Sequence, residues 1–201
     1  MRRTLVYFVA AVMGLSLGLA SSLWMAGLWP EGRSLAFGNV DVAGWRSDFA
    51  VGSEAADPYT RARVARHGLL ALAKTEAVYF TRFVDDDGQP LREACRYRIG
   101  GGSIPAGWWS VTLYDARSML PGNTDGALSI DAGRTGPGAW QAVIASERPA
   151  DAAHWISSRN AGTFDLTLRL YMPEPALLAD PAAVLEPPSV TRLGCEGEDG
   201  G

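Results

Sequence analysis

The residues best suited to binding chemistry in this chain are aromatic and arginine side chains within alternating apolar segments. Flat aromatic rings bind amphipathic ligands, and arginine binds carboxylates through parallel hydrogen bonds. A long polar segment, residues 115–126, follows a tryptophan-rich stretch, and loops above a rigid sheet often carry function. We therefore predict a ligand site beside this segment. Its predicted residues are Arg98, Trp109, Tyr114, Asn123 and Arg169.

Purely structural roles are the alternative for these side chains. Trp108 and Trp109 are adjacent in a predicted strand, so they point to opposite faces and at least one belongs to the core. If Arg98 and Arg169 only form ion pairs with carboxylates on the sheet, their role is structural and they bind no ligand. Five residues that share no cavity would count against a common site.

Catalytic residues are not assigned, because each candidate arrangement has a simpler explanation. Ser110 lacks the Gly-x-Ser-x-Gly turn of a nucleophile, so a triad with His154 has little support. Glu76 opens a predicted strand among apolar neighbours, which would raise its pKa and suit it to glycoside chemistry beside Asp115 or Asp165. We favour the alternative in which Glu76 pairs with an arginine. The candidate arginines are Arg63, Arg98 and Arg169.

Metal-binding residue types are too scattered to predict a metal site. The chain has two histidines and two cysteines, and none stands at ligand spacing from another. Residues 85–87 are three aspartates that predict a solvated turn, because the rest of a calcium loop is missing. Residues 100–102 are three glycines without a phosphate-loop signature, which predicts the end of a strand. No metal and no other cofactor is predicted.

The charge pattern excludes nucleic acid as a partner and indicates a membrane. The net charge is −4 and no cluster of basic residues could follow a phosphate backbone. Leu5–Trp29 carries no charge, and at ~1.5 Å per residue a helix of this length crosses a ~30 Å hydrocarbon core. Arg2 and Arg3 precede it, so the positive-inside rule places the N-terminus in the cytoplasm.

Residues 1–30 are therefore predicted to anchor a single-pass inner-membrane protein through residues 5–29, with a periplasmic domain. The alternative is a cleaved signal peptide, with small residues at 18–20 before the cut. Leu23–Trp29 stays apolar beyond that point, which favours the anchor. Both interpretations export the domain.

The remaining sequence divides into a linker, a helix, several strands and a tail. Residues 31–56 predict a linker that leads into an edge strand. Asp57 and Pro58 are typical of a helix start, and the periodicity predicts a helix to near Lys74. Its predicted buried face is Ala62, Ala65, Leu69 and Leu72. Predicted strands cover residues 77–84, 95–99, 108–114, 128–130, 140–144, 164–171 and 190–193, with a short helix at 173–178.

This order of elements predicts one mainly β domain at residues 57–194, followed by a disordered tail at 195–201. The expected fold is an antiparallel β-sandwich with one packed helix, preceded by a transmembrane helix. Because the domain is predicted to be exported, Cys95 and Cys195 are expected to form an intramolecular disulfide. Two free thiols or a bridge between chains are the alternatives.

The stretch from about Trp45 to Leu193 resembles the bacterial family called domain of unknown function 1214. The resemblance is carried most specifically by Trp108–Tyr114 and by Leu168-Arg169-Leu170-Tyr171 with Pro173. Further matching motifs are Tyr59–Ala65, Leu69–Leu72, Glu76–Phe80, Asn123 and Ser129-Ile130. The resemblance implies a jelly-roll-like sandwich. It assigns no activity to particular residues.

This chain departs from the family pattern at two places. His154-Trp155-Ile156 stands where an Asn-Trp-Leu-like motif is expected, and Ala127 replaces a larger or basic residue. The predicted function is a membrane-tethered periplasmic binding or interaction module. The expected partner is a small molecule, a glycan or an envelope protein. The alternatives are a cell-envelope enzyme acting on a glycan or hydrophobic substrate, and a structural partner of another membrane protein.

Overall fold

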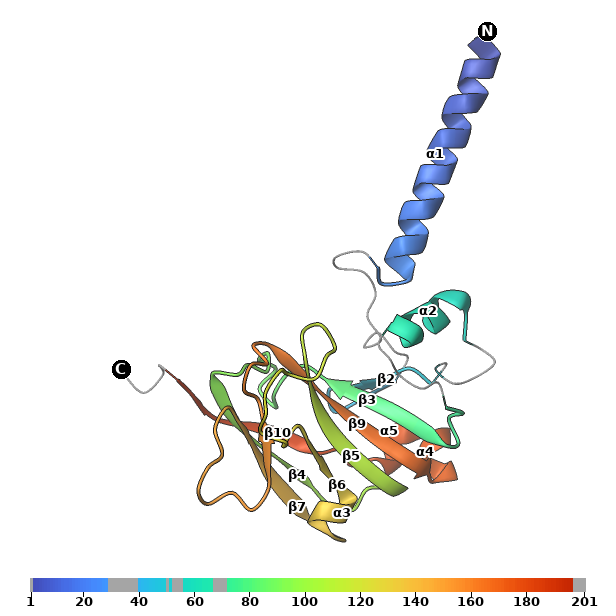
Figure 1. The fold of residues 1–201 in the computed structure, drawn as a ribbon. Coiled ribbons are helices and arrows are strands. Elements are labelled where there is room, and N and C mark those ends of the chain that lie inside the picture. Colours follow the sequence, from blue (N-terminus) through green and yellow to red (C-terminus); the bar gives the residue numbers. More distant parts are fainter. Residues whose placement is uncertain (1, 29–39, 50, 52–55, 67–71, 197–201) are drawn as a thin grey trace.

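The chain forms an N-terminal helix and a β-sandwich, and the computed structural model describes residues 2–28, 40–49, 51, 56–66 and 72–196 (Figure 1). The helices are α1 (Arg2–Met25), α2 (Pro58–Arg66), α3 (Ala132–Thr135), α4 (Pro175–Ala179) and α5 (Pro181–Val184). The strands are β1 (Val40–Val42), β2 (Trp45–Ser47), β3 (Ala77–Arg82), β4 (Cys95–Gly101), β5 (Ala106–Asp115), β6 (Ser129–Asp131), β7 (Trp140–Ala145), β8 (Trp155–Ser157), β9 (Phe164–Pro173) and β10 (Ser189–Cys195).

α1 is the one helix of the described chain that is long and apolar enough to span a membrane. Its 24 residues rise about 36 Å at ~1.5 Å per residue. None of its residues is buried, and Leu5, Phe8 and Leu15 are among its exposed apolar side chains. The predicted apolar N-terminal helix is therefore confirmed.

Two sheets pack face to face and enclose one core. The six-stranded sheet has the order β1-β2-β3-β9-β5-β6, and the four-stranded sheet has the order β10-β4-β7-β8. Neighbouring strands are antiparallel except β7 and β8, which are parallel. In Figure 1, β3, β9 and β5 lie in front of β4 and β7. The mainly β, sandwich-like fold is confirmed.

Strict alternation along the central strands fills the core. Leu166, Leu168 and Leu170 of β9 are fully buried between the sheets. Trp109 of β5 stacks on Trp140 of β7 with ring centroids 4.5 Å apart, so the two sheets meet through an aromatic contact.

The linker region contributes two strands where one was predicted. β1 and β2 form an edge hairpin, and β2 joins the sheet where Arg46 pairs with Thr81. Trp45 is fully buried, and its Nε1 donates a hydrogen bond of 2.8 Å to the carbonyl of Pro188. This contact fixes the hairpin to the chain just before β10.

α2 begins as predicted but is shorter and buries a different face. Asp57 Oδ1 accepts hydrogen bonds from the amides of Tyr59 and Thr60, at 2.8 and 3.1 Å, which confirms the cap. The predicted buried residues Ala62 and Ala65 are exposed, whereas Thr60 and Val64 are buried. The predicted end near Lys74 is wrong, because residues 72–74 are not helical; Leu69 lies outside the described residues.

Three further short elements were not predicted: β8, α3 and α5. Each has four residues or fewer, which is too short for periodicity to reveal. β4 also continues to Gly101, beyond the predicted end at Ile99. A Cβ at Gly100 would lie 2.6 Å from the carbonyl oxygen of Trp140, so a glycine there allows β7 to approach.

The acidic turn after β3 is not a solvated turn, because Asp85 is buried. Its Oδ2 pairs with Arg192 Nη2 of β10 at 2.7 Å, and its Oδ1 accepts the amide hydrogens of Asp87 and Gln89. Asp86 accepts hydrogen bonds from the Val190 amide and the Thr191 hydroxyl, both 3.0 Å. These carboxylates hold β10 against the body of the domain.

Cys95 and Cys195 stand opposite each other at the ends of β4 and β10, at disulfide distance with their Cα atoms 3.9 Å apart. Antiparallel pairing brings the two residues together although they are 100 positions apart in sequence. The predicted pairing is present in the structure. Residues 197–201 of the predicted tail lie outside the described residues.

We expect unreduced, trypsin-digested protein to show the two cysteine peptides linked in mass spectrometry. Reduction should lower the free energy of unfolding by on the order of 2–5 kcal/mol, because it releases a long closed loop in the unfolded state. Alkylation of both thiols in folded, unreduced protein would contradict the disulfide.

Candidate functional site

The outward side chains of β3, β9 and β5 form a polar and aromatic surface, the outer face. It arises from the same alternation that fills the core, since every second residue of these strands points away from it. The outer face comprises Tyr79 and Thr81 of β3, Asp165, Thr167, Arg169 and Tyr171 of β9, and Trp108, Ser110, Thr112 and Tyr114 of β5.

Cross-strand pairing arranges the outer face in rows. Arg169 occupies the middle strand, between Tyr79 on β3 and Ser110 on β5. The other rows are Tyr171–Trp108, Thr81–Thr167–Thr112 and Asp165–Tyr114. From Trp108 to Tyr114 the face extends about 20 Å, at ~3.4 Å per residue.

Arg169 lies flat along the outer face. Its cross-strand partner is Ser110, yet Nη1 donates to Thr112 Oγ1 at 3.0 Å and Nη2 donates to the Tyr114 hydroxyl. Its guanidinium carbon also lies 5.3 Å from the centre of the Tyr114 ring. The side chain is therefore held in one direction by two neutral hydroxyl groups and one aromatic ring.

Aromatic rings occupy the opposite end of the outer face. Trp108 is 38% exposed, and its ring centroid lies 5.4 Å from that of Tyr171 at a tilted angle. Burial raises the pKa of Tyr79, with Tyr171 adding to the rise and Arg169 opposing it. These rings offer a hydrophobic platform on the same face as the arginine.

Asp165 is the titratable group of the polar end. Burial raises the pKa of Asp165 to about 7. The Thr167 hydroxyl, 3.4 Å from Oδ1, and the Arg169 charge oppose the rise, whereas the Asp115 carboxylate adds to it. A carboxyl group with this pKa exchanges its proton near neutral pH, as a general acid or base must.

The structure brings together two of the five predicted ligand-binding residues. Tyr114 and Arg169 contact each other on the outer face. Trp109 is 6% exposed and belongs to the core, so Trp108 is the outward member of the pair. Arg98 is exposed on β4, in the other sheet. The expected opposite directions of Trp108 and Trp109 are confirmed.

The side chain of Asn123 forms hydrogen bonds that hold its loop in place. Its Nδ2 donates to the carbonyl of Arg159 at 2.8 Å, and its Oδ1 accepts the Asp125 amide at 3.2 Å. Asn160 Nδ2 in turn donates to the carbonyl of Gly122 at 2.8 Å. These bonds tie the loop to the segment after β8. The five predicted residues therefore share no single surface.

The catalytic candidates are also separated. Glu76 is exposed and accepts the Ala73 amide at 3.1 Å, so the predicted apolar surroundings are wrong, and neither Arg98 nor Arg169 forms an ion pair with it. The side chain of Arg63 lies outside the described part of the structure. Ser110 lies in the six-stranded sheet, whereas His154 precedes β8 in the four-stranded sheet. Burial alone would raise the pKa of Asp115, but hydrogen bonds from Met119 and Arg117 lower it.

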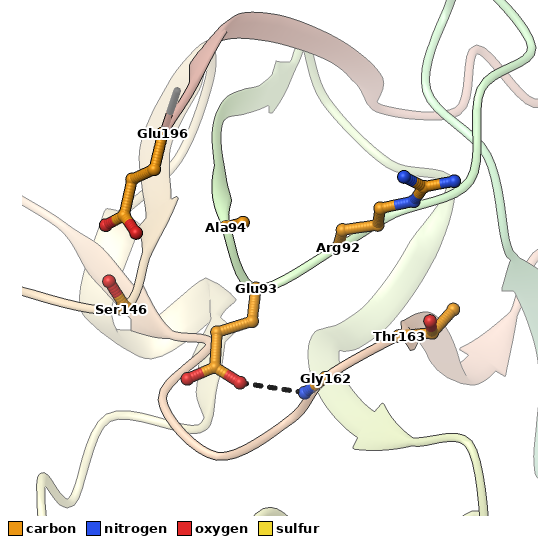
Figure 2. A pocket seen from close by; sticks show the side chains of 7 residues that line it. All are labelled: Arg92, Glu93, Ala94, Ser146, Gly162, Thr163 and Glu196. Carbon is orange, nitrogen blue, oxygen red and sulfur yellow. Dashed lines mark hydrogen bonds between the residues drawn. The ribbon is translucent and has the colours of Figure 1, made fainter. Parts of the chain in front are cut away.

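A hollow of about 430 Å³ lies away from the outer face, beside the disulfide end of the sandwich. Figure 2 shows Glu93 and Glu196 on one side of it and Arg92 on the other. Glu93 accepts the amides of Asn160 and Gly162, at 2.8 and 2.9 Å, so it holds a turn. No predicted ligand-binding residue lines this hollow. In the part of the chain that the structure describes, no three metal-binding side chains are gathered.

Trp108 and Tyr171 belong to the outer face but were not predicted as ligand-binding residues, and Asp165 was considered only as a catalytic partner of Glu76. The alternation of β9 already placed Asp165, Arg169 and Tyr171 on one side. The sequence did not reveal which tryptophan faces outward, because both positions are equally apolar.

Comparison with known proteins identifies the family. Residues 76–175 match the family described as protein of unknown function (DUF1214), and the chain belongs to it. The matched segment runs from β3 through β9 and contains the whole outer face. No curated protein matches this chain.

Two crystal structures were found as structural neighbours of this chain, and one of them has a TM-score above 0.5. The VPA0106 protein from Vibrio parahaemolyticus is 18% identical, with a TM-score of 0.53, and the similarity covers 69% of this chain and 36% of that one. An uncharacterised protein from Burkholderia cenocepacia is 14% identical with a TM-score of 0.39, covering 58% of this chain and 29% of that one. The similarity thus spans about a third of each structure's length.

We expect Asp165→Asn to stabilise the protein at pH 8 by on the order of 2–4 kcal/mol, with little effect at pH 4. The raised pKa of Asp165 means that the folded state holds a proton which the unfolded state has already lost. Stability of the wild type therefore falls as pH rises from about 4 to about 7. Urea unfolding of the full chain in detergent measures the difference.

The exposed Asp151→Asn change is the matched control and should be neutral at both pH values. Equal stability of Asp165→Asn and wild type at pH 8 would contradict the raised pKa.

Proposed function

We propose that this chain is a membrane-tethered binding module whose outer face binds a small molecule or glycan outside the cytoplasm. The observation that carries the proposal is Arg169, which Thr112 and Tyr114 orient on the same face as the Trp108–Tyr171 rings. None of these side chains is needed to fill the core, since they point away from it. Oriented polar groups beside an aromatic platform are typical of ligand sites.

The proposed location rests on two independent features. Arg2 and Arg3 precede an apolar helix of membrane-spanning length, which by the positive-inside rule leaves the domain on the far side. The Cys95–Cys195 pair is consistent with that compartment, because disulfides persist in oxidising environments.

Asp165 supports an envelope enzyme acting on a glycan as the second candidate. Its raised pKa is suited to proton transfer near neutral pH. Asp115, the other described carboxylate with a shifted pKa, already accepts hydrogen bonds from the Arg117–Met119 turn, however. We therefore place binding ahead of catalysis.

For location, we expect a reporter enzyme active only in the cytoplasm to be silent when fused after Gly201. A reporter active only outside the cytoplasm should work at the same position, because α1 would carry the domain across the membrane. The reverse pair of results would overturn the proposed location.

For binding, we expect members of a panel of oligosaccharides, amino acids and fatty acids to raise the Tm of the full chain in detergent. Preferential binding to the folded state stabilises it by mass action. Trp108→Ala should abolish the increase, whereas Leu193→Ala, an exposed apolar change on the other sheet, should retain it. The same increase in both variants, or no increase with any compound, would contradict binding at the outer face.

A further inference from the structure

Arg169 is exceptional among the arginines whose side chains the structure describes. Three of these arginines are not exposed, namely Arg82, Arg169 and Arg192. Arg82 Nη2 lies 2.8 Å from Asp86 Oδ1, and Arg192 Nη2 lies 2.7 Å from Asp85 Oδ2. No carboxylate of the described residues lies within ion-pair distance of Arg169. Asp165 interacts with the Arg169 charge only at longer range, so this partly buried guanidinium has no direct ion pair.

The contacts of Arg169 orient its guanidinium but do not neutralise it. Thr112 and Tyr114 each accept one hydrogen bond from it, and both oxygens are neutral. A guanidinium carries five N–H donors, so most of them have no acceptor among the described residues. A partly desolvated charge of this kind costs free energy unless an anion approaches it.

We propose that Arg169 binds the carboxylate of an acidic oligosaccharide whose sugar rings lie along the outer face toward Trp108 and Tyr171. This inference rests on the proposed binding function and specifies the ligand class.

A carboxylate fits this position better than a phosphate. The planar fork of arginine matches a carboxylate with two parallel hydrogen bonds. Arg46, opposite Thr81 on the neighbouring strand β2, is already paired with Asp41 at 3.2 Å, and Asp165 on the same strand as Arg169 disfavours a doubly charged group. A ligand group with a single negative charge therefore fits best between the attraction of Arg169 and the repulsion of Asp165.

An extended ligand with several rings fits the rest of the outer face. Tyr79 lies opposite Arg169, and the Trp108–Tyr171 pair lies one row further along. Because the guanidinium reaches toward Tyr114, it stands on the order of 15 Å from Trp108 along the strand. Hydroxyl groups of Thr81, Thr167 and Thr112 form the row between Asp165 and Arg169 and add partners for sugar hydroxyls.

The test compares trigalacturonic acid with its fully methyl-esterified form, using the full chain in detergent and isothermal titration calorimetry. The two probes share size and rings and differ in charge. We expect the acid to bind at least about tenfold more tightly, which is the usual effect of a charge-assisted hydrogen bond. An excess of inorganic phosphate at constant ionic strength should not displace it.

Arg169→Gln should weaken binding of the acid by about tenfold or more and remove the preference over the ester. Arg98→Gln is the matched control, because it makes the same change at an exposed arginine of the other sheet and should leave both affinities unchanged. Tyr114→Phe removes one orienting hydroxyl while keeping the charge of Arg169, and it should also weaken binding of the acid. This variant tests the same contact if Arg169→Gln fails to fold.

Equal affinity for the acid and the ester, or displacement by phosphate, would overturn the inferred ligand class. If such binding still depends on Trp108, the proposed binding function remains. Failure of wild type to bind either probe, or equal loss in Arg98→Gln and Arg169→Gln, would also overturn the inference.

Discussion

The pairing of β5 with β9 is the constraint on which the rest of the sandwich depends. The two strands are in register from Ala106–Pro173 to Asp115–Phe164, the longest pairing in the domain. Because side chains alternate along both strands, one register fixes two surfaces at once. Leu166, Leu168 and Leu170 enter the core, and the outer face is left for polar and aromatic groups. A shift of one residue would bury Arg169 and expose the leucines.

Carboxylate contacts and a disulfide hold the edge strand β10 of the four-stranded sheet in place. β10 arrives last in the chain and lies at the sheet edge, next to β4. Asp85 and Asp86 hold it from the turn after β3, so a turn of one sheet secures the edge strand of the other. The Cys95–Cys195 pair closes the other end of the same strand pair. These contacts keep the sandwich closed without using any residue of the outer face.

Arg82 and Arg192 differ from Arg169 in their partners, and this difference distinguishes arginines that support the fold from the arginine proposed to bind a ligand. Arg82 and Arg192 are neutralised by aspartates, as expected of charges that serve the fold. Arg169 is oriented instead by hydroxyl groups. The family match at residues 76–175 includes Arg169 and excludes Arg192 and Cys195. The segment that matches the family thus contains the whole proposed binding surface but only some of the residues that hold β10 in place.

The sequence by itself determined the apolar N-terminal helix, the mainly β class, most strand positions and the cysteine partners, because these follow from local periodicity and composition. It also placed Asp165, Thr167, Arg169 and Tyr171 on one face of β9. Tertiary structure decided which face of each strand became the core, so Trp109 was buried and Trp108 exposed. It also separated Arg98 from Arg169 and buried Asp85. Side chains alternate between the two faces of a strand, so the sequence shows which residues share a face. Which of the two faces becomes the core depends on the sheet that packs against it, and no local pattern contains that information.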